Sequence, residues 1–272
     1  MKKVVLFSDS GNIAEVLFHS PFFHLEAVMC EKGRKNLDLI TFSYIRGVNI
    51  HEVENNEELI ETISQYNLDL AIMCGFGIIL NYDTISNIDT YNIHPGKLPQ
   101  YKGRHPTFFA TINGEKSIYF TLHKVIKKID GGEIIDEVEM EYYYWQNEND
   151  VKSFLFEAFS VLVDRLYLFL EGKIKIKENS GGKYYHPVTK ADKILDPNLS
   201  VAALLNIVRA QASFGGGIFL FKGQEYLVDK IKITKYKNDD ITEEKIVINK
   251  ERPIGIKIDN EYYLKFCSLV AN

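Results

Sequence analysis

KVVLFSDSGN, residues 3 to 12, decides the fold of this chain. The apolar run from Val4 to Phe7 has the length of a short buried strand, and a polar turn that contains Gly11 separates it from a second apolar segment. We interpret the second segment as a helix, so the chain opens as a strand followed by a helix. The apolar run stops at Ser8 and is too short for the hydrophobic region of a signal peptide.

The same alternation continues through the first part of the chain. Strands are expected at 25–30, 48–50, 68–74, 90–94, 118–125 and 133–140. A helix is expected at 55–66, where an Asn caps the start, acidic residues occupy the first turn, and Leu59 and Ile63 are four residues apart. A long helix at 148–171 closes a first domain at 1–180. Strands separated by helices predict an α/β fold with a Rossmann-like, doubly wound, mostly parallel sheet.

The remainder of the chain predicts a smaller β-rich domain. Residues 181–198 are rich in Gly, Pro, Asn and Lys and are typical of a linker, and 199–272 would form the C-terminal domain. A short helix at 199–210 precedes a Gly-rich turn, and short strands follow at 217–221, 225–233, 244–249, 254–258 and 261–267. We expect this domain to form a homodimer, because exposed strand edges need covering.

Composition limits the class of protein. The chain has 272 residues, of which 46% are hydrophobic and 25% charged, as in a soluble globular protein. It has no apolar run of 18 residues, so no membrane span is expected, and its three cysteines lack CxxC spacing, which favours a reducing cytoplasm. Net charge is −5, and from Lys183 onward 14 basic residues are interleaved with 11 acidic ones. This balance argues against a nucleic-acid partner.

Two further groups of residues have more than one interpretation. The aromatic run from Tyr142 to Trp145 would form either a platform for a base or, as we favour, a strand edge packed under the long helix. Cys74 is interpreted as a small buried hydrophobe rather than a nucleophile. Gly75 and Gly77 do not form a dinucleotide fingerprint.

The stretch NIHPGKLPQYKGRHP, residues 92–106, contains the most informative polar residues. Asn92 and His94 stand at the end of an apolar strand, where open α/β sheets bind ligands. An amide can donate to a developing oxyanion, an imidazole can move a proton, and a carboxylate such as Asp130 can orient that imidazole. No GxSxG nucleophile is present, so direct acyl transfer to a substrate amine is expected. The spacing alone also allows an ordinary strand exit with a solvated histidine.

These residues carry a resemblance to a known family. The motifs resemble those of the folate-dependent formyltransferases over about residues 1–180: Asn92-x-His94, Leu98-Pro99-x-Tyr101-x-Gly103 and Asp130-x-Gly132-x-Ile134. GRHPTFFATINGE at 103–115 and the Thr121-Leu122-His123 step are similar to the branch that acts on nucleotide-linked amino sugars. The resemblance implies 10-formyltetrahydrofolate as formyl donor, no metal, and a dTDP- or UDP-linked amino deoxysugar as acceptor, used for bacterial surface glycans such as lipopolysaccharide O-antigen.

The resemblance also implies roles for individual residues. Asn92 would hold the formyl oxygen, His94 would assist proton transfer, and Asp130 would pair with His94 or relay the amine proton. Which of the last two is the base stays open. Folate would contact Ile78, Ile79, Leu80, Arg104, Ile126, Lys127, Lys128, Ile129 and Asp130. The sugar nucleotide would contact Ser8, Gly11, Asn12, Lys97, Tyr101, Lys102 and His105.

The loop after His94 yields more specific expectations. Lys97, Lys102 and Arg104 would place positive charge near a pyrophosphate or the folate tail. Gly96-Lys97 departs from the Ser-Leu of many relatives. Pro99 is a candidate for a cis peptide bond. His105 and a second histidine at position 123 would be either substrate contacts or structural residues.

Other functions remain open on the sequence. Methionyl-tRNA formyltransferases resemble this chain in both domains, although its charge argues against tRNA. Glycinamide ribonucleotide formyltransferases are usually shorter and lack the extra domain. A non-catalytic module that senses folate or sugar nucleotide is the alternative outside the enzymes. The amine at C3 or C4, and the dTDP or UDP carrier, are not distinguished.

Overall fold

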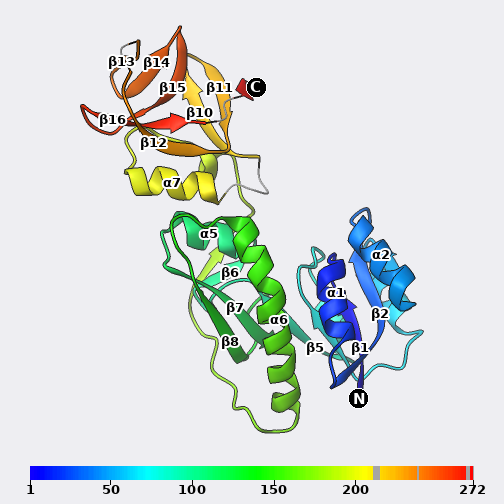
Figure 1. Ribbon diagram of the computed structural model, residues 1–272. Coiled ribbons are helices and arrows are strands. Elements are labelled where there is room, and N and C mark those ends of the chain that lie inside the picture. The colour runs from blue at the N-terminus through cyan, green and yellow to red at the C-terminus, as the bar shows by residue number, and fades with distance from the viewer. Residues whose placement is uncertain (211–214, 238, 268–269, 272) are drawn as a thin grey trace. The chain divides into compact units, whose positions relative to one another are not determined.

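The chain forms two compact units. The computed structural model describes residues 1–210, 215–237, 239–267 and 270–271, and Figure 1 shows the course of the chain. The first unit combines Met1–Gly103, Ile118–Met140 and Ser153–Tyr184, and the second combines Arg104–Ser117, Glu141–Lys152 and Tyr185–Asn272. Both units are discontinuous in sequence, and their limits differ from the domain boundaries expected at 180 and 198, which stay predictions. The homodimer and the cytoplasmic location also stay predictions.

A seven-stranded sheet organises the first unit. Its strands are β1 (Lys2–Phe7), β2 (Phe23–Glu31), β3 (Asn49–Val53), β4 (Leu70–Met73), β5 (Asp89–His94), β7 (Ser117–Lys124) and β8 (Ile134–Glu141). Their order is β3-β2-β1-β4-β5-β7-β8; the pairs from β3 to β5 are parallel, and β7 is antiparallel to β5. This mostly parallel sheet with helices confirms the predicted fold class.

Most helices of this unit begin where the sequence supplies a capping side chain. They are α1 (Gly11–Phe18), α2 (Leu37–Arg46), α3 (Asn56–Ile63), α4 (Tyr82–Ile85) and the long α6 (Glu148–Leu170). Ser10, Asn36 and Asn55 each accept a hydrogen bond from the backbone N–H three residues later. Such caps satisfy N–H groups that a helix start leaves unpaired, which explains why these helices begin there.

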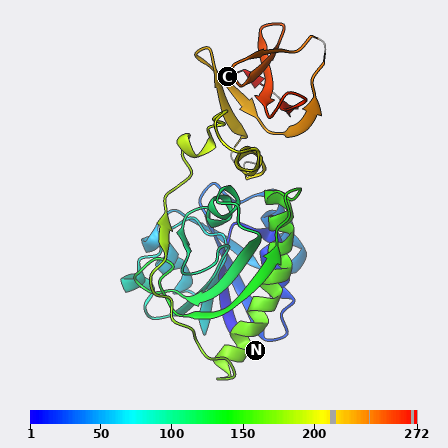
Figure 2. The same cartoon turned by 90° about the vertical axis from the view of Figure 1, so that its left-hand side faces the viewer.

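Side-chain alternation along β1 supplies both faces of the sheet. Val5 and Phe7 join a buried cluster with Leu59 and Ile63 of α3, while the intervening strand residues point to the opposite face. Figure 2 shows α6 on one side of the sheet and the cyan segment that contains α3 on the other. The sheet is therefore covered on both faces, as a parallel sheet requires.

The strand order places a topological switch between β1 and β4. The chain moves outward from β1 to β3 and then returns to β4 on the other side of β1. Ligands of open α/β sheets bind outside the carboxyl ends of strands at such a switch. The segments after β1, β4 and β5 all leave the sheet at this edge.

The second unit is built on helices α5 (Pro106–Ile112) and α7 (Val201–Arg209) and on short antiparallel strands. One sheet has the order β10-β11-β17 and is formed by β10 (Gly217–Phe221), β11 (Gln224–Val228) and β17 (Val270–Ala271). The other has the order β12-β16-β15-β14-β13 and is formed by β12 (Ile231–Lys235), β13 (Ile241–Glu243), β14 (Ile246–Asn249), β15 (Arg252–Lys257) and β16 (Tyr262–Phe266). This unit also contains the 3-10 helix Ala191–Lys193, whereas β6 (Tyr101–Gly103) belongs to the first unit and β9 (Lys183–Tyr185) ends one residue beyond it. Leu204, Phe219, Val228 and Leu264 belong to the core that α7 shares with the strands.

One strand prediction is wrong in this unit. Residues 225–233 were expected as one strand, but the chain leaves β11 after Val228 and enters β12, in a different sheet, at Ile231. Asp229 and Lys230 make this transition. The apolar positions shift by one residue at this point, from Tyr226 and Val228 to Ile231 and Ile233. No Gly or Pro marks the shift, so the residue types alone do not show that the chain changes sheets.

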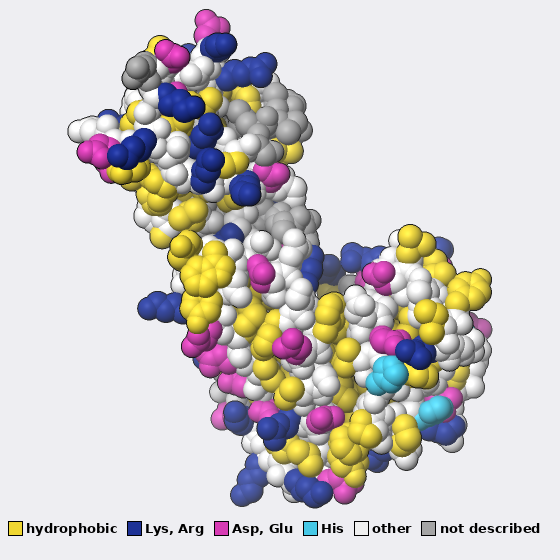
Figure 3. Space-filling model, viewed as in Figure 1, with side chains coloured by type: hydrophobic (Ala, Val, Ile, Leu, Met, Phe, Trp, Pro, Cys, Tyr) yellow, Lys and Arg dark blue, Asp and Glu magenta, His cyan; other side chains and the backbone are white. Residues whose placement is uncertain are grey.

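The surface carries charges of both signs. On the face shown in Figure 3, acidic and basic side chains are interspersed over the unit that contains β1, and basic ones are more frequent over the strands of the second unit. Within the described residues, none of the helices combines the length and the apolar character that a membrane crossing requires.

The packing of α3 yields a stability prediction. Leu59→Ala should lower the free energy of unfolding by about 2 to 5 kcal/mol, because Leu59 is fully buried in the cluster beneath the sheet. Leu37→Ala, at a site that is 78% exposed, should change it by less than about 0.5 kcal/mol. Urea unfolding followed by circular dichroism measures both, and equal losses would contradict this packing.

Candidate active site

Two neighbouring strands bring four polar side chains to one buried patch. Asn92 and His94 lie on β5, Thr121 and His123 lie on β7, and the antiparallel register pairs Asn92 with His123 and His94 with Thr121. Residues two apart on a strand share a face, so all four point the same way. None is more than 7% exposed. Strand pairing, rather than sequence proximity, therefore assembles this patch.

The hydrogen bonds of His94 determine which ring nitrogen is available for chemistry. Nε2 lies 2.7 Å from the carbonyl oxygen of Tyr101, which can only accept, so Nε2 carries the proton. Nδ1 lies 3.6 Å from Oδ1 of Asp130. In the neutral ring, Nδ1 therefore has the lone pair, and a proton taken up there would face a carboxylate.

His123 orients the amide of Asn92. Its Nδ1 donates to the carbonyl of Lys124 at 2.8 Å, which leaves Nε2 as an acceptor. The side-chain nitrogen of Asn92 lies 3.2 Å from this Nε2 and donates to it. An Asn amide has a second N–H to offer. The sequence prediction left His123 undecided, and the signal that could have placed it is its position opposite Asn92 across β5 and β7.

Asp130 completes the arrangement from a loop. Its Oδ2 accepts the backbone N–H of Gly103 at 2.8 Å, and its Oδ1 lies 3.6 Å from both His94 and His123. Burial would raise the pKa of Asp130, but the positive charge that His94 carries when it is protonated, together with His123 and the Gly103 N–H, outweighs burial and lowers this pKa to about 2. Burial lowers the pKa of His94, although Asp130 opposes this shift. The resting site thus pairs an ionised carboxylate with a neutral imidazole.

Side chains of segment 179–184 donate hydrogen bonds to the backbone of the loop that carries Asp130. The Asn179 amide donates to the carbonyls of Asp130 and Gly132 at 2.9 and 2.7 Å, and the Tyr184 hydroxyl donates to the carbonyl of Ile129. Asp130 itself has a left-handed backbone with φ of 46°. A Cβ on Gly132 would come within 1.9 Å of the Lys124 carbonyl oxygen, so only glycine fits there.

The structure corrects the prediction for Lys102. This side chain is 1% exposed, and its ammonium donates to the carbonyls of Asn179 and Gly181 at 3.4 and 3.1 Å. Burial lowers its pKa. The ammonium of Lys102 is therefore bound to the segment that supports the Asp130 loop, and it is not exposed for contact with a phosphate. The cause is the close approach of 179–181, which the sequence pattern does not show.

Other residues expected to bind the sugar nucleotide are placed as follows. Ser8 is buried and its hydroxyl accepts the N–H of Ser10, and Gly11 is closely packed on the backbone of Asp38. Asn12 is exposed, and the ammonium of Lys97 lies 4.1 Å from the ring centre of Tyr119. Tyr101 is 6% exposed, and its carbonyl oxygen accepts the hydrogen bond from Nε2 of His94. Their contacts with a ligand stay predictions.

The residues expected to bind folate fall in three places. Ile78, Ile79 and Leu80 follow β4 at the switch, and Ile79 is 59% exposed. Ile126 and Ile129 are also exposed, Lys128 is exposed, and Lys127 forms an ion pair with Asp83 at 2.8 Å. Arg104 belongs to the second unit, where its N–H donates to the carbonyl of Tyr185. His105, which was expected to contact the sugar nucleotide, follows it in the same unit and has φ of 54°.

Two smaller predictions are confirmed. The Leu98–Pro99 peptide bond is cis. Cys74 is 2% exposed, and burial raises the pKa of its thiol to about 12, so it behaves as a hydrophobe. In the part of the chain that the structure describes, no group of three or more His, Cys, Asp or Glu residues is placed to hold a metal ion.

Part of the chain matches a known protein family. Residues 26–156, just under half of the chain, match the family model described as formyl transferase. The matched segment contains Asn92, His94, His123 and Asp130. The match supports the formyl transferase family.

Curated relatives match part of the chain. The methionyl-tRNA formyltransferase of Thermotoga maritima is 29% identical over 167 residues, which cover 60% of this chain and 53% of that protein. The bifunctional polymyxin resistance protein ArnA of Wigglesworthia glossinidia brevipalpis is 29% identical over 181 residues, covering 65% of this chain and 27% of that protein. The chain thus spans about half the length, or less, of these relatives.

Solved structures share the fold over more of the chain. WlaRD, a sugar 3N-formyl transferase solved in the presence of dTDP and 5-N-formyl-THF, has a TM-score of 0.70 at 18% identity and covers 98% of both chains. A 4-N formyltransferase from Francisella tularensis has a TM-score of 0.66 at 21% identity, covering 82% of this chain and 95% of that chain. At these identities the likeness shows the fold alone.

The buried carboxylate yields a prediction on stability and pH. The folded pKa of Asp130 is about 2, below its ordinary 3.8. The contribution of the ionised Asp130 to the free energy of unfolding is therefore complete above pH 3.8 and is lost as the pH falls through the pKa of the folded protein, about 2. Asp130→Asn should be less stable than the unmodified protein by about 2 kcal/mol at neutral pH.

Urea unfolding of both proteins across a pH series measures this difference. It should narrow as the pH falls below 3.8, because the carboxylate is then increasingly protonated in the unfolded chain. A difference that does not vary with pH would show that Asp130 is not stabilised as an anion.

Proposed function

We propose that this protein transfers a formyl group from 10-formyltetrahydrofolate to the amine of a nucleotide-linked amino deoxysugar, with a dTDP-linked 3-amino or 4-amino sugar favoured. The observation that carries this proposal is the convergence of Asn92, His94 and Asp130 in one buried patch at the carboxyl end of β5. The formyl transferase match over residues 26–156 supports the reaction class.

The geometry suits direct attack of an amine on the formyl carbon. The amine nitrogen forms a bond to this carbon, and the carbonyl electron pair moves to oxygen as a tetrahedral intermediate forms. The Asn92 amide, held by His123 through one N–H, offers its other N–H to this oxyanion. No residue of the protein becomes acylated, in keeping with the absence of a GxSxG nucleophile.

His94 is the better candidate for the base. It is neutral at rest, because burial lowers its pKa, and its Nδ1 faces Asp130. Nδ1 takes the proton from the attacking nitrogen, and the ionised Asp130 stabilises the imidazolium that forms. The proton then passes to the folate nitrogen as its bond to the formyl carbon breaks, so that N-formyl sugar and tetrahydrofolate leave.

The nature of the acceptor rests on weaker support. WlaRD, which is a sugar 3N-formyl transferase, matches 98% of this chain at 98% of its own length, and the net charge of −5 is unfavourable for tRNA. The methionyl-tRNA formyltransferases among the sequence relatives, at 24–29% identity, favour a second candidate, formylation of methionyl-tRNA.

One assay separates these candidates. The purified chain is incubated with 10-formyltetrahydrofolate and with dTDP-3-amino, dTDP-4-amino and UDP-4-amino sugars or methionyl-tRNA. A sugar nucleotide that gains the mass of one formyl group, with equal release of tetrahydrofolate, is the expected result. Formylation of methionyl-tRNA alone would favour the second candidate. If neither a sugar nucleotide nor methionyl-tRNA gains a formyl group, both candidates are contradicted.

Variants connect the assay to the site. His94→Ala should reduce the rate by about 10²- to 10⁴-fold because the proton acceptor is lost. Asn92→Ala should reduce it by about 10²- to 10³-fold because one oxyanion donor is lost. His24→Ala, which changes an exposed histidine of the same unit, should retain the rate. Near-normal turnover by the first two variants would exclude these roles.

The pKa of His94 predicts the pH dependence. Since this pKa is lowered from 6.5, kcat/KM should fall on the acid side with an apparent pKa below that value as Nδ1 becomes protonated. Asp130 raises the pKa of His94, so Asp130→Asn should move the acid limb to still lower pH while decreasing the maximum. If the apparent pKa of the acid limb is the same in Asp130→Asn as in the unmodified protein, the electrostatic interaction between Asp130 and His94 is excluded.

A further inference from the structure

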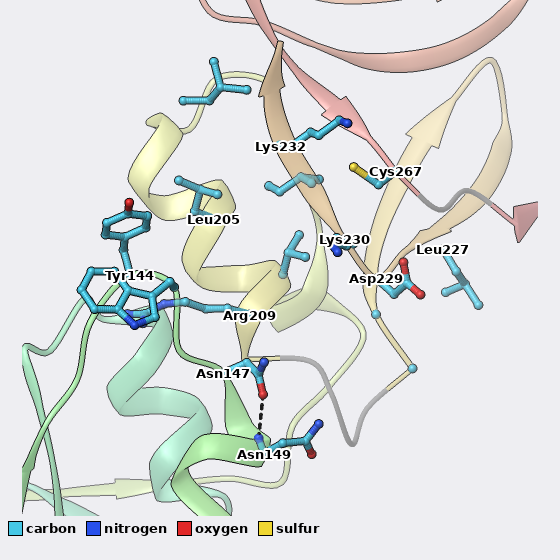
Figure 4. Close-up of a pocket in the computed structure, with 16 residues that line it drawn as sticks. Tyr144, Asn147, Asn149, Leu205, Arg209, Leu227, Asp229, Lys230, Lys232 and Cys267 are labelled. Atoms are coloured by element: carbon cyan, nitrogen blue, oxygen red, sulfur yellow. Dashed lines mark hydrogen bonds between the residues drawn. The ribbon is translucent and has the colours of Figure 1, made fainter.

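The second unit contains a cavity of about 1070 Å³ that the proposed reaction does not use. All of its lining residues belong to this unit, and none is a residue to which we assign a role in formyl transfer. Its volume is at the scale of pockets that enclose small ligands. Figure 4 shows Tyr144 on one side of α7 and Lys230 and Lys232 on the other.

One wall of this cavity is an exposed aromatic ledge, which we define as Tyr144 and Trp145. They are 74% and 64% exposed. The ring of Tyr143 stacks on Trp145 with centroids 4.7 Å apart and planes within 4°. The sequence prediction of a strand edge under the long helix is therefore wrong for these residues, which lie in a turn after β8.

Arg209 of α7 holds this aromatic turn in place. Its guanidinium donates to the carbonyls of Tyr143 and Gln146 at 2.8 and 3.4 Å, and it lies 4.2 Å from the ring centre of Tyr142. The N–H of Tyr143 donates to the side chain of Gln146. A large aromatic surface is thus kept exposed by a fixed turn, which lowers the cost of ordering it when a ligand binds.

The other side of the cavity supplies positive charge. Lys230 follows β11 and Lys232 lies on β12, and both are exposed. Among the residues that the structure describes, no carboxylate forms an ion pair with either ammonium. Asp229 contributes a carboxylate to the lining. The two lysines together with Arg209 still leave the lining net positive.

An aromatic ledge opposite two lysines fits a ligand that has a planar ring at one end and an anion at the other. Aromatic side chains stack on nucleobases without selecting among them, and lysine ammonium groups bind phosphates. We propose that the second unit binds a nucleoside diphosphate in this cavity, with the base on Tyr144 and Trp145 and the phosphates at Lys230 and Lys232.

Trp145 makes the proposal directly measurable, because it is the one tryptophan among the 272 residues. Titration of the full chain with dTDP or UDP, without folate, should quench its fluorescence saturably. The Lys230→Gln/Lys232→Gln double variant should bind about tenfold more weakly or worse, because charge-assisted contacts are lost. Lys235→Gln, on the same strand but outside the lining, should retain the affinity.

Three results would overturn the proposal. They are absence of saturable quenching, equal quenching in the double-lysine variant, and quenching by an RNA hairpin with a CCA end at far lower concentration than by dTDP or UDP. Emission that changes with protein concentration alone would also overturn it, because the ledge would then be covered by a second copy of the chain. His94→Ala should leave the titration unchanged, so loss of formyl transfer and loss of this site can be distinguished.

Discussion

The antiparallel pairing of β5 with β7 is the interaction on which the candidate active site depends. It places Asn92 opposite His123 and so gives the Asn92 amide a fixed partner. The remaining strand pairs of the first unit, from β3 to β5, are parallel. The change of direction brings β7, with its own polar side chains Thr121 and His123, against Asn92 and His94 of β5.

The second constraint is the burial of one carboxylate between two imidazoles. Asp130 would be costly to bury alone, and the Gly103 N–H and the two histidines offset this cost. Segment 179–184, which is far from β5 in sequence, holds the backbone around Asp130. The electrostatic arrangement is therefore built into the folded protein before any ligand binds, which is how oxyanion and proton transfer sites gain most of their effect.

Lys102 and the aromatic ledge show how residue type alone misleads. A lysine in a basic loop suggests phosphate binding, yet Lys102 is buried and held by carbonyls of Asn179 and Gly181. A run of four aromatic residues suggests packing, yet Tyr144 and Trp145 are exposed beside a cavity. In each case a distant segment decides the outcome, 179–181 for the lysine and Arg209 for the turn.

By itself the sequence determined the local features of this protein. Strand alternation, an Asn cap and turn residues predicted the elements and the fold class, because each depends on neighbours close in the chain. Two separate motifs, one with Asn92 and His94 and the other with Asp130, indicated the chemistry. Tertiary structure alone decided that His123 orients Asn92, that Lys102 is buried, and that β11 and β12 belong to different sheets. These outcomes depend on pairing and burial between segments far apart in sequence, which the local pattern of residues does not encode.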